Sequence, residues 1–172
     1  VDWGTDSISI HEEIQFVEAY LELQKYRFGN RLSYQIDVED SCQGYCVPKL
    51  TLVTFAENAC VHGLENKTAA GWIFVRCYCD EGVLCMEVED TGHGMSPDLV
   101  RDMQENMNNA SMQLLKENRR VGIMNACLRL RMATGNQACF ELESEKGSGT
   151  IITIKIPVDA LHKKAWKQNE NI

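Results

Sequence analysis

The sequence has no long hydrophobic run, few prolines and no concentration of positive charge. No apolar stretch approaches the roughly 20 residues that cross a bilayer, and the first residues lack the basic and then apolar pattern of a signal peptide. The 3 prolines and 12 glycines exclude a collagen-like or low-complexity chain. The 17 lysines and arginines form no long run and the net charge is −8, which would repel a phosphate backbone, so we expect no nucleic-acid partner.

Cysteine is plentiful, with 8 residues, but the spacing is not that of a zinc site. No C-x-x-C pair occurs, and Cys42 and Cys46 are the only two in a loop-like segment. Two ligands do not close a tetrahedral site. We therefore predict free thiols that are mostly buried, in a reducing cytoplasm. The start at Val1 instead of methionine indicates a segment of a longer protein.

Apolar periodicity predicts one domain in which helices alternate with hairpins. Ser9 and Glu12 form a capping box at the start of a helix that ends at Gly29. Further helices are predicted at 49–61 and 122–134, and strands at 32–38, 72–79, 83–89, 139–144 and 151–156. A loop is predicted up to Pro48, and the polar residues 95–120 are predicted to hold a short helix and a mobile loop. This order favours an α+β two-layer sandwich, with helices on one face of a mixed β-sheet.

A carboxylate and an amide, Glu57 and Asn58, lie side by side near the end of the helix predicted at 49–61, followed by His62. An amide oxygen is a hard ligand that suits Mg²⁺, and a carboxylate within hydrogen-bond reach can orient or deprotonate a nucleophile. Purely structural roles also fit. Asn58 could cap a neighbouring turn, Glu57 could be solvated, and His62 could interact with the negative end of the helix.

The segment Asp90-Thr91-Gly92-His93-Gly94 directly follows a predicted strand. Glycines let a backbone approach a ligand closely, and a carboxylate at a strand end can accept a hydrogen bond from the exocyclic amine of adenine. An ordinary Asp-x-Gly turn has the same pattern. We expect His93 to be an exposed loop residue.

Glycines also begin a predicted helix and the last predicted strand. Gly122 would leave the N–H groups and the positive dipole end of its helix open to a phosphate. Gly149 and Thr150 open the last strand. Each glycine could equally be a simple turn, and Thr150 an ordinary strand residue.

The order of these segments resembles that of the GHKL ATPase superfamily. It is most similar to the sensor histidine kinases of the group that senses autolysis or carbon-source signals. Residues 57–63 resemble the N box, 90–94 the first glycine box, and 122–125 with Arg129-Leu130 the second. Tyr20-Leu21, Arg27-Phe28, Gly149-Thr150 and Ile156-Pro157 also fit, so the resemblance covers about residues 8–158.

The resemblance implies an ATP-binding catalytic domain that works with Mg²⁺. Asn58 would bind the metal, Glu57 and Asn58 would act in catalysis, and Asp90 would contact the adenine amine with support from Thr150. The residues implied to bind ATP are Asn58, His62, Asp90, Gly92, Gly94, Gly122, Gly149 and Thr150. Residues 1–30 would be a linker helix, 31–158 the catalytic domain with an ATP lid at about 95–121, and 159–172 a polar tail.

The resemblance also implies that the phosphoaccepting histidine lies upstream of Val1, because none of the 4 histidines matches it. We expect a cytoplasmic domain whose parent is a membrane-anchored homodimer that works with a response regulator. The chain departs from the family pattern at Val61, where a basic residue is common, and at Arg120, in the place of a glycine. Arg119 and Arg120 could compensate with positive charge or be solvated. Two alternatives remain: a nucleotide-gated interaction module without kinase activity, and an ATPase in which Glu57 activates water.

Overall fold

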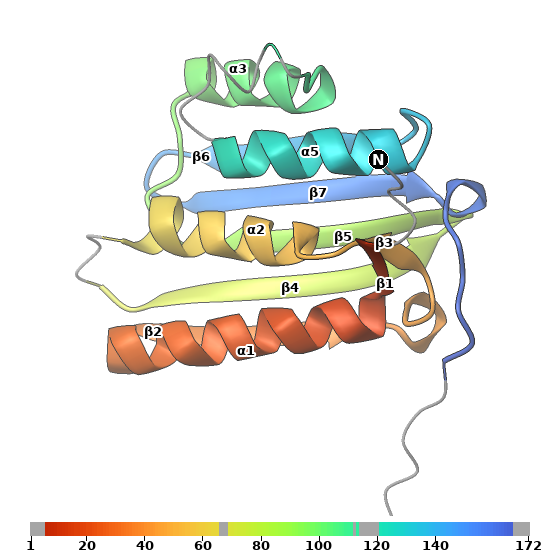
Figure 1. Ribbon diagram of the computed structural model, residues 1–172. Helices are drawn as coiled ribbons and strands as arrows, with labels where there is room; N and C mark the ends of the chain where they lie inside the picture. Colours follow the sequence, from red (N-terminus) through yellow and green to blue (C-terminus); the bar gives the residue numbers. More distant parts are fainter. Residues whose placement is uncertain (1–5, 66–68, 112, 114–120, 167–172) are drawn as a thin grey trace, which may run out of the picture.

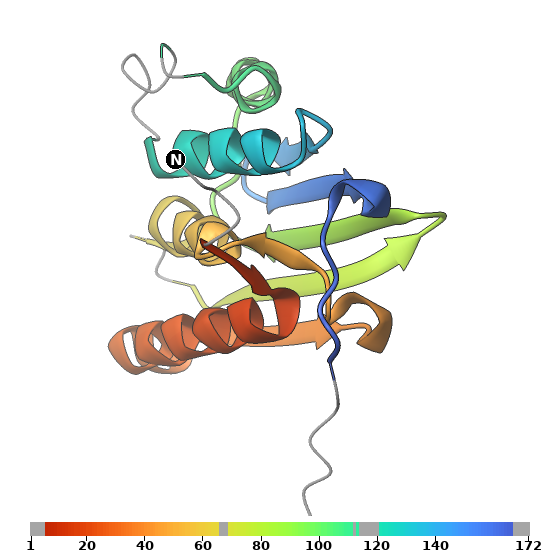
Figure 2. The ribbon, with the colours of Figure 1, turned by 45° about the vertical axis from the view of Figure 1, so that its right-hand side comes forward.

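A five-stranded mixed β-sheet carries helices on one face (Figures 1 and 2). The computed structural model describes residues 6–65, 69–111, 113 and 121–166. The sheet has the order β2 (Leu32–Val38), β4 (Gly71–Asp80), β5 (Val83–Asp90), β7 (Gly149–Pro157) and β6 (Cys139–Glu145). The β2–β4 pair is parallel and the other pairs are antiparallel. The predicted two-layer α+β architecture is confirmed.

Four α-helices cover the sheet in the described part of the chain: α1 (Ile10–Phe28), α2 (Thr51–Asn58), α3 (Pro97–Asn108) and α5 (Val121–Ala133). The predicted capping box begins α1, where the Ser9 Oγ accepts from Glu12 N and the Glu12 Oε1 accepts from Ser9 N, both at 3.2 Å. The helix ends at Gly29, which has a φ of +64°. In its apolar stripe, Val17 and Leu21 are fully buried, and Ile14 and Phe28 are partly buried.

The hydrophobic core lies between the helices and the sheet. Strand alternation places apolar residues such as Ile73 and Val75 of β4 on the helix side. On that side Phe55 of α2 stacks on Phe140 of β6, with ring centroids 6.4 Å apart. The β4–β5 hairpin turns at Glu81 and Gly82, both at positive φ, which suits the twist of a two-residue hairpin. No helix in the described ranges is both long and apolar enough to span a membrane.

The segment predicted as a loop before Pro48 contains two short elements instead. A 3₁₀ turn, η3, spans Asp40–Cys42, and β3 (Cys46–Pro48) pairs antiparallel with β1 (Ser7–Ser9). Strands of three residues are too short to show an alternating pattern, which is why the sequence did not indicate them.

The helix predicted at 49–61 changes form in its second half. Regular α-helix runs only from Thr51 to Asn58, and a π-helical turn, η4, covers Ala59–Leu64. The wider turn includes a hydrogen bond from Glu65 N to Cys60 O at 3.0 Å. The shift directly follows Asn58, and such π turns are frequent at functional sites.

Helix α3 packs on the domain through both apolar and polar side chains. Met103 and Met107 are buried, and polar side chains of the same helix bind the edge strand β6. Asn108 accepts from Phe140 N at 2.9 Å and donates to Phe140 O at 2.8 Å, and Gln104 accepts from Leu142 N at 2.7 Å. The short helix predicted in this stretch is therefore present as α3, and the mobile loop expected after it lies largely outside the described residues.

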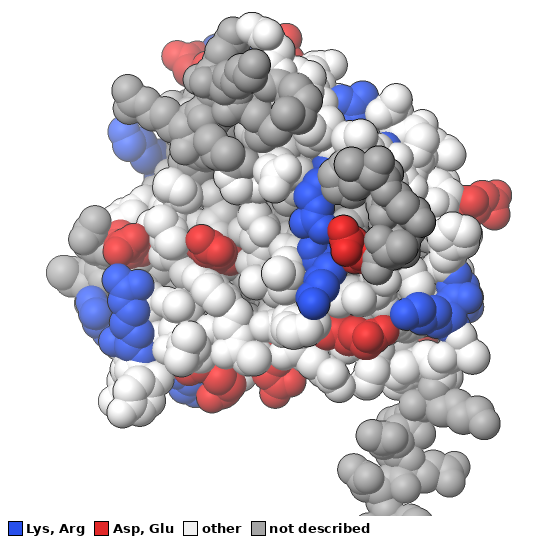
Figure 3. Space-filling view, in the orientation of Figure 1, with Lys and Arg blue, Asp and Glu red and all other residues white. Residues whose placement is uncertain are grey.

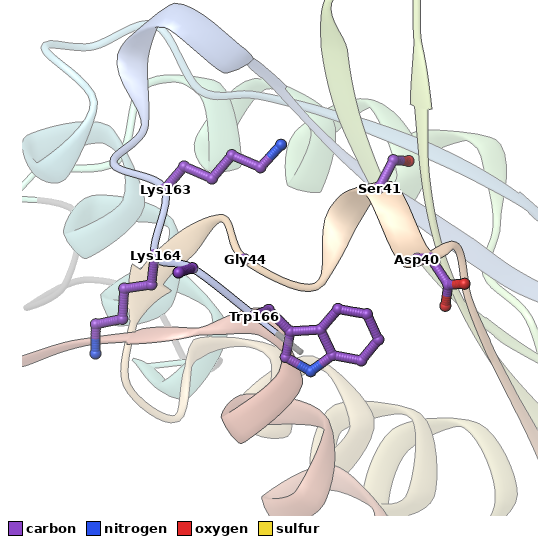
Figure 4. Close-up of a pocket in the computed structure, with 7 residues that line it drawn as sticks. Asp40, Ser41, Gly44, Lys163, Lys164 and Trp166 are labelled. Atoms are coloured by element: carbon purple, nitrogen blue, oxygen red, sulfur yellow. The ribbon is translucent and has the colours of Figure 1, made fainter. Parts of the chain in front are cut away.

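The chain after β7 folds back along η3. Cys46 N donates to His162 O at 2.8 Å and Lys164 N donates to Gly44 O at 2.7 Å. Together with Asp40, Ser41 and Trp166, this segment lines a pocket of about 390 Å³ (Figure 4). The part of the polar tail up to Trp166 is thus attached to the domain.

Candidate nucleotide-binding site

The end of β5 meets the π-helical turn η4 at a point where only glycine fits. Asp90 is 5% exposed, and a Cβ on Gly63 would lie 2.6 Å from its carboxylate. Gly92 N donates to Asp90 Oδ1 at 2.9 Å. A Cβ on Gly92 would lie 1.9 Å from Gly63 O, and His93 N donates to that same oxygen at 2.9 Å. The two glycines therefore hold the N box against the first glycine box.

Two more glycines join this region to the hairpin between β6 and β7. Gly94 and Gly149 have φ values of +69° and +100°, which other residues rarely adopt. A Cβ on Gly94 would lie 2.0 Å from Glu145 O, and one on Gly149 would lie 2.0 Å from Asp90 O. The backbone on both sides of Asp90 is thus fixed by close contacts.

Thr150 lies directly opposite Asp90 in the β5–β7 register. Its hydroxyl is 2.8 Å from the hydroxyl of Ser144, which also donates to Gly149 O at 2.8 Å and accepts from Met95 N at 2.9 Å. Ser144 therefore ties the strand ends to the segment that leads into α3. The sequence analysis missed this residue, although the β6–β7 register would have indicated the pair.

The other predicted site residues lie on α2, η4 and α5. Asn58 is half-buried at the end of α2, whereas Glu57, His62 and Gly122 are exposed. A Cβ on Gly122 would lie 3.5 Å from Thr54 Cγ2, an ordinary contact, so this position does not require glycine for steric reasons. Thr54 and Asn58 are one helical turn apart on the same face of α2. The start of α5 is thus near the face that carries Asn58.

A buried carboxylate fixes the beginning of α2. Glu13 of α1 is fully buried and accepts from Leu50 N at 2.7 Å and from Val53 N at 3.1 Å. Burial raises the pKa of Glu13, and the hydrogen bonds from the α2 backbone oppose this shift. Sequence analysis missed this role, because an acidic residue in a first helical turn is an ordinary feature of helices.

The cysteine in the N box is not a nucleophile. Burial raises the pKa of the Cys60 thiol to about 12, a hydrogen bond with Tyr20 lowers it, and the charges of Asp90 and Glu57 raise it. A thiol that stays protonated neither attacks a phosphate nor binds a metal. Cys60 therefore fills space beneath the site.

The chemistry available here suits a metal that is held mainly by its substrate. No group of three or more His, Cys, Asp or Glu that could hold a metal occurs in the part of the chain that the structure describes. The surface over α2 is mostly uncharged (Figure 3). Mg²⁺ needs few protein ligands when phosphates and waters supply the rest, so the amide oxygen of Asn58 fits it. His93 is exposed, as predicted, with its Nε2 3.1 Å from Glu65 O.

Some of the residues discussed in the sequence analysis lie outside the described ranges. They are residues 112 and 114–120 of the expected ATP lid at 95–121, which include Arg119 and Arg120. The described part of that stretch is α3 and the residues next to it, which pack on β6.

Comparison with known proteins places the chain in a family. The family model described as histidine kinase-, DNA gyrase B-, and HSP90-like ATPase matches residues 48–160, and one described as histidine kinase matches residues 2–32. The sensor histidine kinase YesM of Bacillus subtilis is 31% identical over 152 residues, which cover 88% of this chain and 24% of that protein. The sensor protein LytS of Bacillus cereus is 28% identical over 150 residues, or 87% and 25% of the two chains.

A solved structure shows the same fold. Full-length ShkA in complex with AMPPNP matches with a TM-score of 0.59 and 21% identity, over 93% of this chain and 32% of that one. The chain spans about a quarter of the length of the two curated relatives. The first family model covers more than half of the chain, from Pro48 at the end of β3 to Ala160, just after β7. The chain therefore belongs to the family of histidine kinase-, DNA gyrase B- and HSP90-like ATPases.

Proposed function

We propose that this domain binds ATP with Mg²⁺ at the junction of η4, β5 and the β6–β7 hairpin, and transfers the γ-phosphoryl group to a histidine upstream of Val1. The observation that carries the proposal is the close contact of Gly63, Gly92 and Asp90, where Cβ atoms would overlap the carboxylate and the backbone. A site that excludes side chains on both sides of a buried carboxylate is well suited to a flat, hydrogen-bonding base.

We assign the reading of adenine to Asp90. The hydrogen bond from Gly92 N fixes the orientation of the carboxylate. An ionised carboxylate offers only acceptors, so it pairs with the exocyclic amine of adenine and disfavours the carbonyl that guanine presents. Gly94, Gly149 and Thr150 support this geometry through the strand ends that surround Asp90.

We assign the phosphate side to α2 and α5. Asn58 would hold Mg²⁺ through its amide oxygen, and the free N–H groups at the start of α5, near Gly122, would face the phosphates. Bound Mg²⁺ neutralises charge on the transferring phosphoryl group. Glu57 would orient or deprotonate the acceptor imidazole, and His62 would contact the nucleotide from η4.

The remaining parts of the chain have supporting roles in this proposal. Residues 1–30 would link the domain to the upstream segment, 31–158 would form the catalytic domain, and 95–121 would close over ATP and exclude water, so that the imidazole takes the phosphoryl group. Residues 159–172 would be the polar C-terminal tail. The full-length protein would be a membrane-anchored homodimer with this domain in the cytoplasm and a response regulator as its partner.

Transfer to a separately supplied upstream segment tests the proposal. The chain is mixed with that segment and with γ-labelled ATP and Mg²⁺, and acid-labile label on the segment is measured against time. We expect label on the segment's histidine, none when that histidine is replaced by Gln, and a large loss of rate with Asn58→Ala.

Two other outcomes would support the competing functions. Steady release of phosphate, with no label transferred to the segment, would indicate an ATPase in which Glu57 activates water. ATP binding with neither transfer nor hydrolysis would indicate a nucleotide-gated interaction module. Val61 motivates the second alternative, because an apolar side chain that is 40% exposed stands where the family commonly has a basic one.

A further inference from the structure

Two cysteines far apart in the sequence have their sulfur atoms in contact at the end of the sheet. Cys42 Sγ and Cys79 Sγ are 3.4 Å apart, and both residues are free thiols. Cys42 is fully buried at the end of η3, whereas Cys79 is partly exposed near the end of β4. The pair lies outside the nucleotide site, at the opposite end of β4 from the Gly71 end where η4 lies.

Backbone and side-chain hydrogen bonds hold the two cysteines together. Glu39 N donates to Cys77 O at 2.9 Å, which continues the pairing of β2 with β4. The Glu39 carboxylate then accepts from Cys79 N and from Ser41 Oγ, both at 3.4 Å, and Cys42 N donates to Glu39 O at 3.0 Å. The turn η3 is thus folded onto β4 with Cys42 directed toward Cys79.

We propose that Cys42 and Cys79 are a reversible dithiol–disulfide modification site, oxidised by a peroxide. The Cys79 thiol gives up its proton and the thiolate attacks one peroxide oxygen, so that an S–O bond forms and the O–O bond breaks. The other oxygen leaves as hydroxide, which takes up the proton from Cys79 and becomes water. The Cys42 sulfur then attacks the Cys79 sulfur, an S–S bond forms, the S–O bond breaks, and the hydroxide leaves with the Cys42 proton as a second water. The two sulfurs lose two electrons in total, and these reduce the peroxide.

The surroundings assign the order of the two steps. Burial raises the pKa of Cys42 to about 12, and the hydrogen bond with Cys79 adds to the effect. Cys42 therefore remains a thiol until its partner has been oxidised. Cys79 is the less buried residue of the pair. The residues next to it, Cys77 and Tyr78, line with Glu39 a hollow of about 330 Å³, which is large enough for a small peroxide.

A disulfide here would close a loop from residue 42 to residue 79. That loop contains β3, α2 and η4, so it includes Glu57 and Asn58. The cross-link would restrict the unfolded chain, and we expect the Tm of the domain to rise by about 5 to 15 °C. This inference does not depend on the proposed transfer reaction.

Peroxide treatment of the whole chain tests the proposal, in a Cys139→Ser background. Cys139 is the exposed cysteine and would form disulfides between molecules. The treated protein is digested with trypsin without reduction. Cleavage leaves Cys42 and Cys46 together in residues 32–49, and Cys77, Cys79 and Cys85 together in residues 77–101, so variants must identify the partners.

We expect hydrogen peroxide to remove two free thiols per chain, to link the two peptides, and to raise the Tm, all reversed by dithiothreitol. Cys42→Ser and Cys79→Ser should each abolish the link and the rise in Tm. The matched controls Cys46→Ala and Cys77→Ala should keep both. A link that survives Cys42→Ser or Cys79→Ser, irreversible oxidation of Cys79 without a link, or no loss of thiols would each overturn the proposal.

Discussion

Replacing Glu13 by Gln should weaken the attachment of α1 to the helix that carries the N box. Glu13 is fully buried and accepts hydrogen bonds from Leu50 N at 2.7 Å and Val53 N at 3.1 Å. Gln has nearly the same size, but only one of its two terminal atoms accepts a hydrogen bond. The substitution therefore turns an N–H donor toward one backbone N–H of α2.

The expected magnitude follows from that unpaired donor. Leaving one buried donor without an acceptor costs about 1 to 3 kcal/mol. We therefore expect Glu13→Gln to lower the free energy of unfolding by about 1 to 3 kcal/mol.

Urea unfolding at about pH 6 measures this difference, with the midpoint and the m-value determined separately. The midpoint should fall while the m-value stays constant, and the Tm should fall by about 2 to 4 °C per kcal/mol. Glu18→Gln is the matched control, because Glu18 is exposed on the same helix, and it should change stability by less than about 0.5 kcal/mol. Equal stability of Glu13→Gln and the wild type would refute the role given to Glu13.

Three further predictions concern the charge of Glu13 and the site at the end of β5. Since burial raises the pKa of Glu13 above 4.5, the folded state binds its proton more tightly than the unfolded state. The stability that protonated Glu13 contributes is therefore fully present below about pH 4.5, and it is lost as the pH rises through the pKa of the folded state. The stability difference between wild type and Glu13→Gln should thus shrink with rising pH. A difference that grows with pH would contradict the raised pKa of Glu13. Asp90→Asn should cost about 1 to 3 kcal/mol of ATP-binding free energy, and GTP should bind the wild type poorly. Calorimetry measures both affinities. Unchanged ATP affinity in a folded mutant, or equal affinity of the wild type for GTP and ATP, would remove Asp90 from adenine recognition. Gly92→Ala should abolish nucleotide binding, because its Cβ would lie 1.9 Å from Gly63 O. Gly122→Ala should remain folded with stability near that of the wild type, because its Cβ would lie 3.5 Å from Thr54. Similar effects of the two substitutions on folding and binding would argue against the steric account.

The elements that the sequence predicted well are those with a long internal pattern. The strands of the main sheet alternate between a buried and a polar face, and α1 has a capping box at one end and Gly29 at the other. Local residues alone determine these features. The short strands β1 and β3 have no such pattern, and they form only because they pair with each other.

The parts of the site that the sequence could not predict depend on contacts between distant segments. The π-helical turn η4 lets Gly63 approach Asp90, which lies 27 residues later in the sequence. Glu13 supports α2 from another helix, and Ser144 joins Thr150 across a hairpin. The motif residues could be proposed from the sequence, because glycine and asparagine stand out among apolar neighbours. The contacts that require glycine at Gly92, Gly94 and Gly149 are with backbone atoms of distant segments, which the sequence does not show.

Magnesium-dependent ATP binding by the wild type and by Asn58→Ala tests the central claim most directly. Calorimetry with a non-hydrolysable ATP analogue, with and without Mg²⁺, is compared with adenosine on both proteins. If Asn58 holds the metal on the phosphates, the mutant loses most of the gain in affinity that Mg²⁺ provides and binds adenosine as the wild type does. If Asn58 only caps a backbone group, the mutant loses about 1 kcal/mol of stability and keeps the full magnesium effect, which would contradict the proposed site.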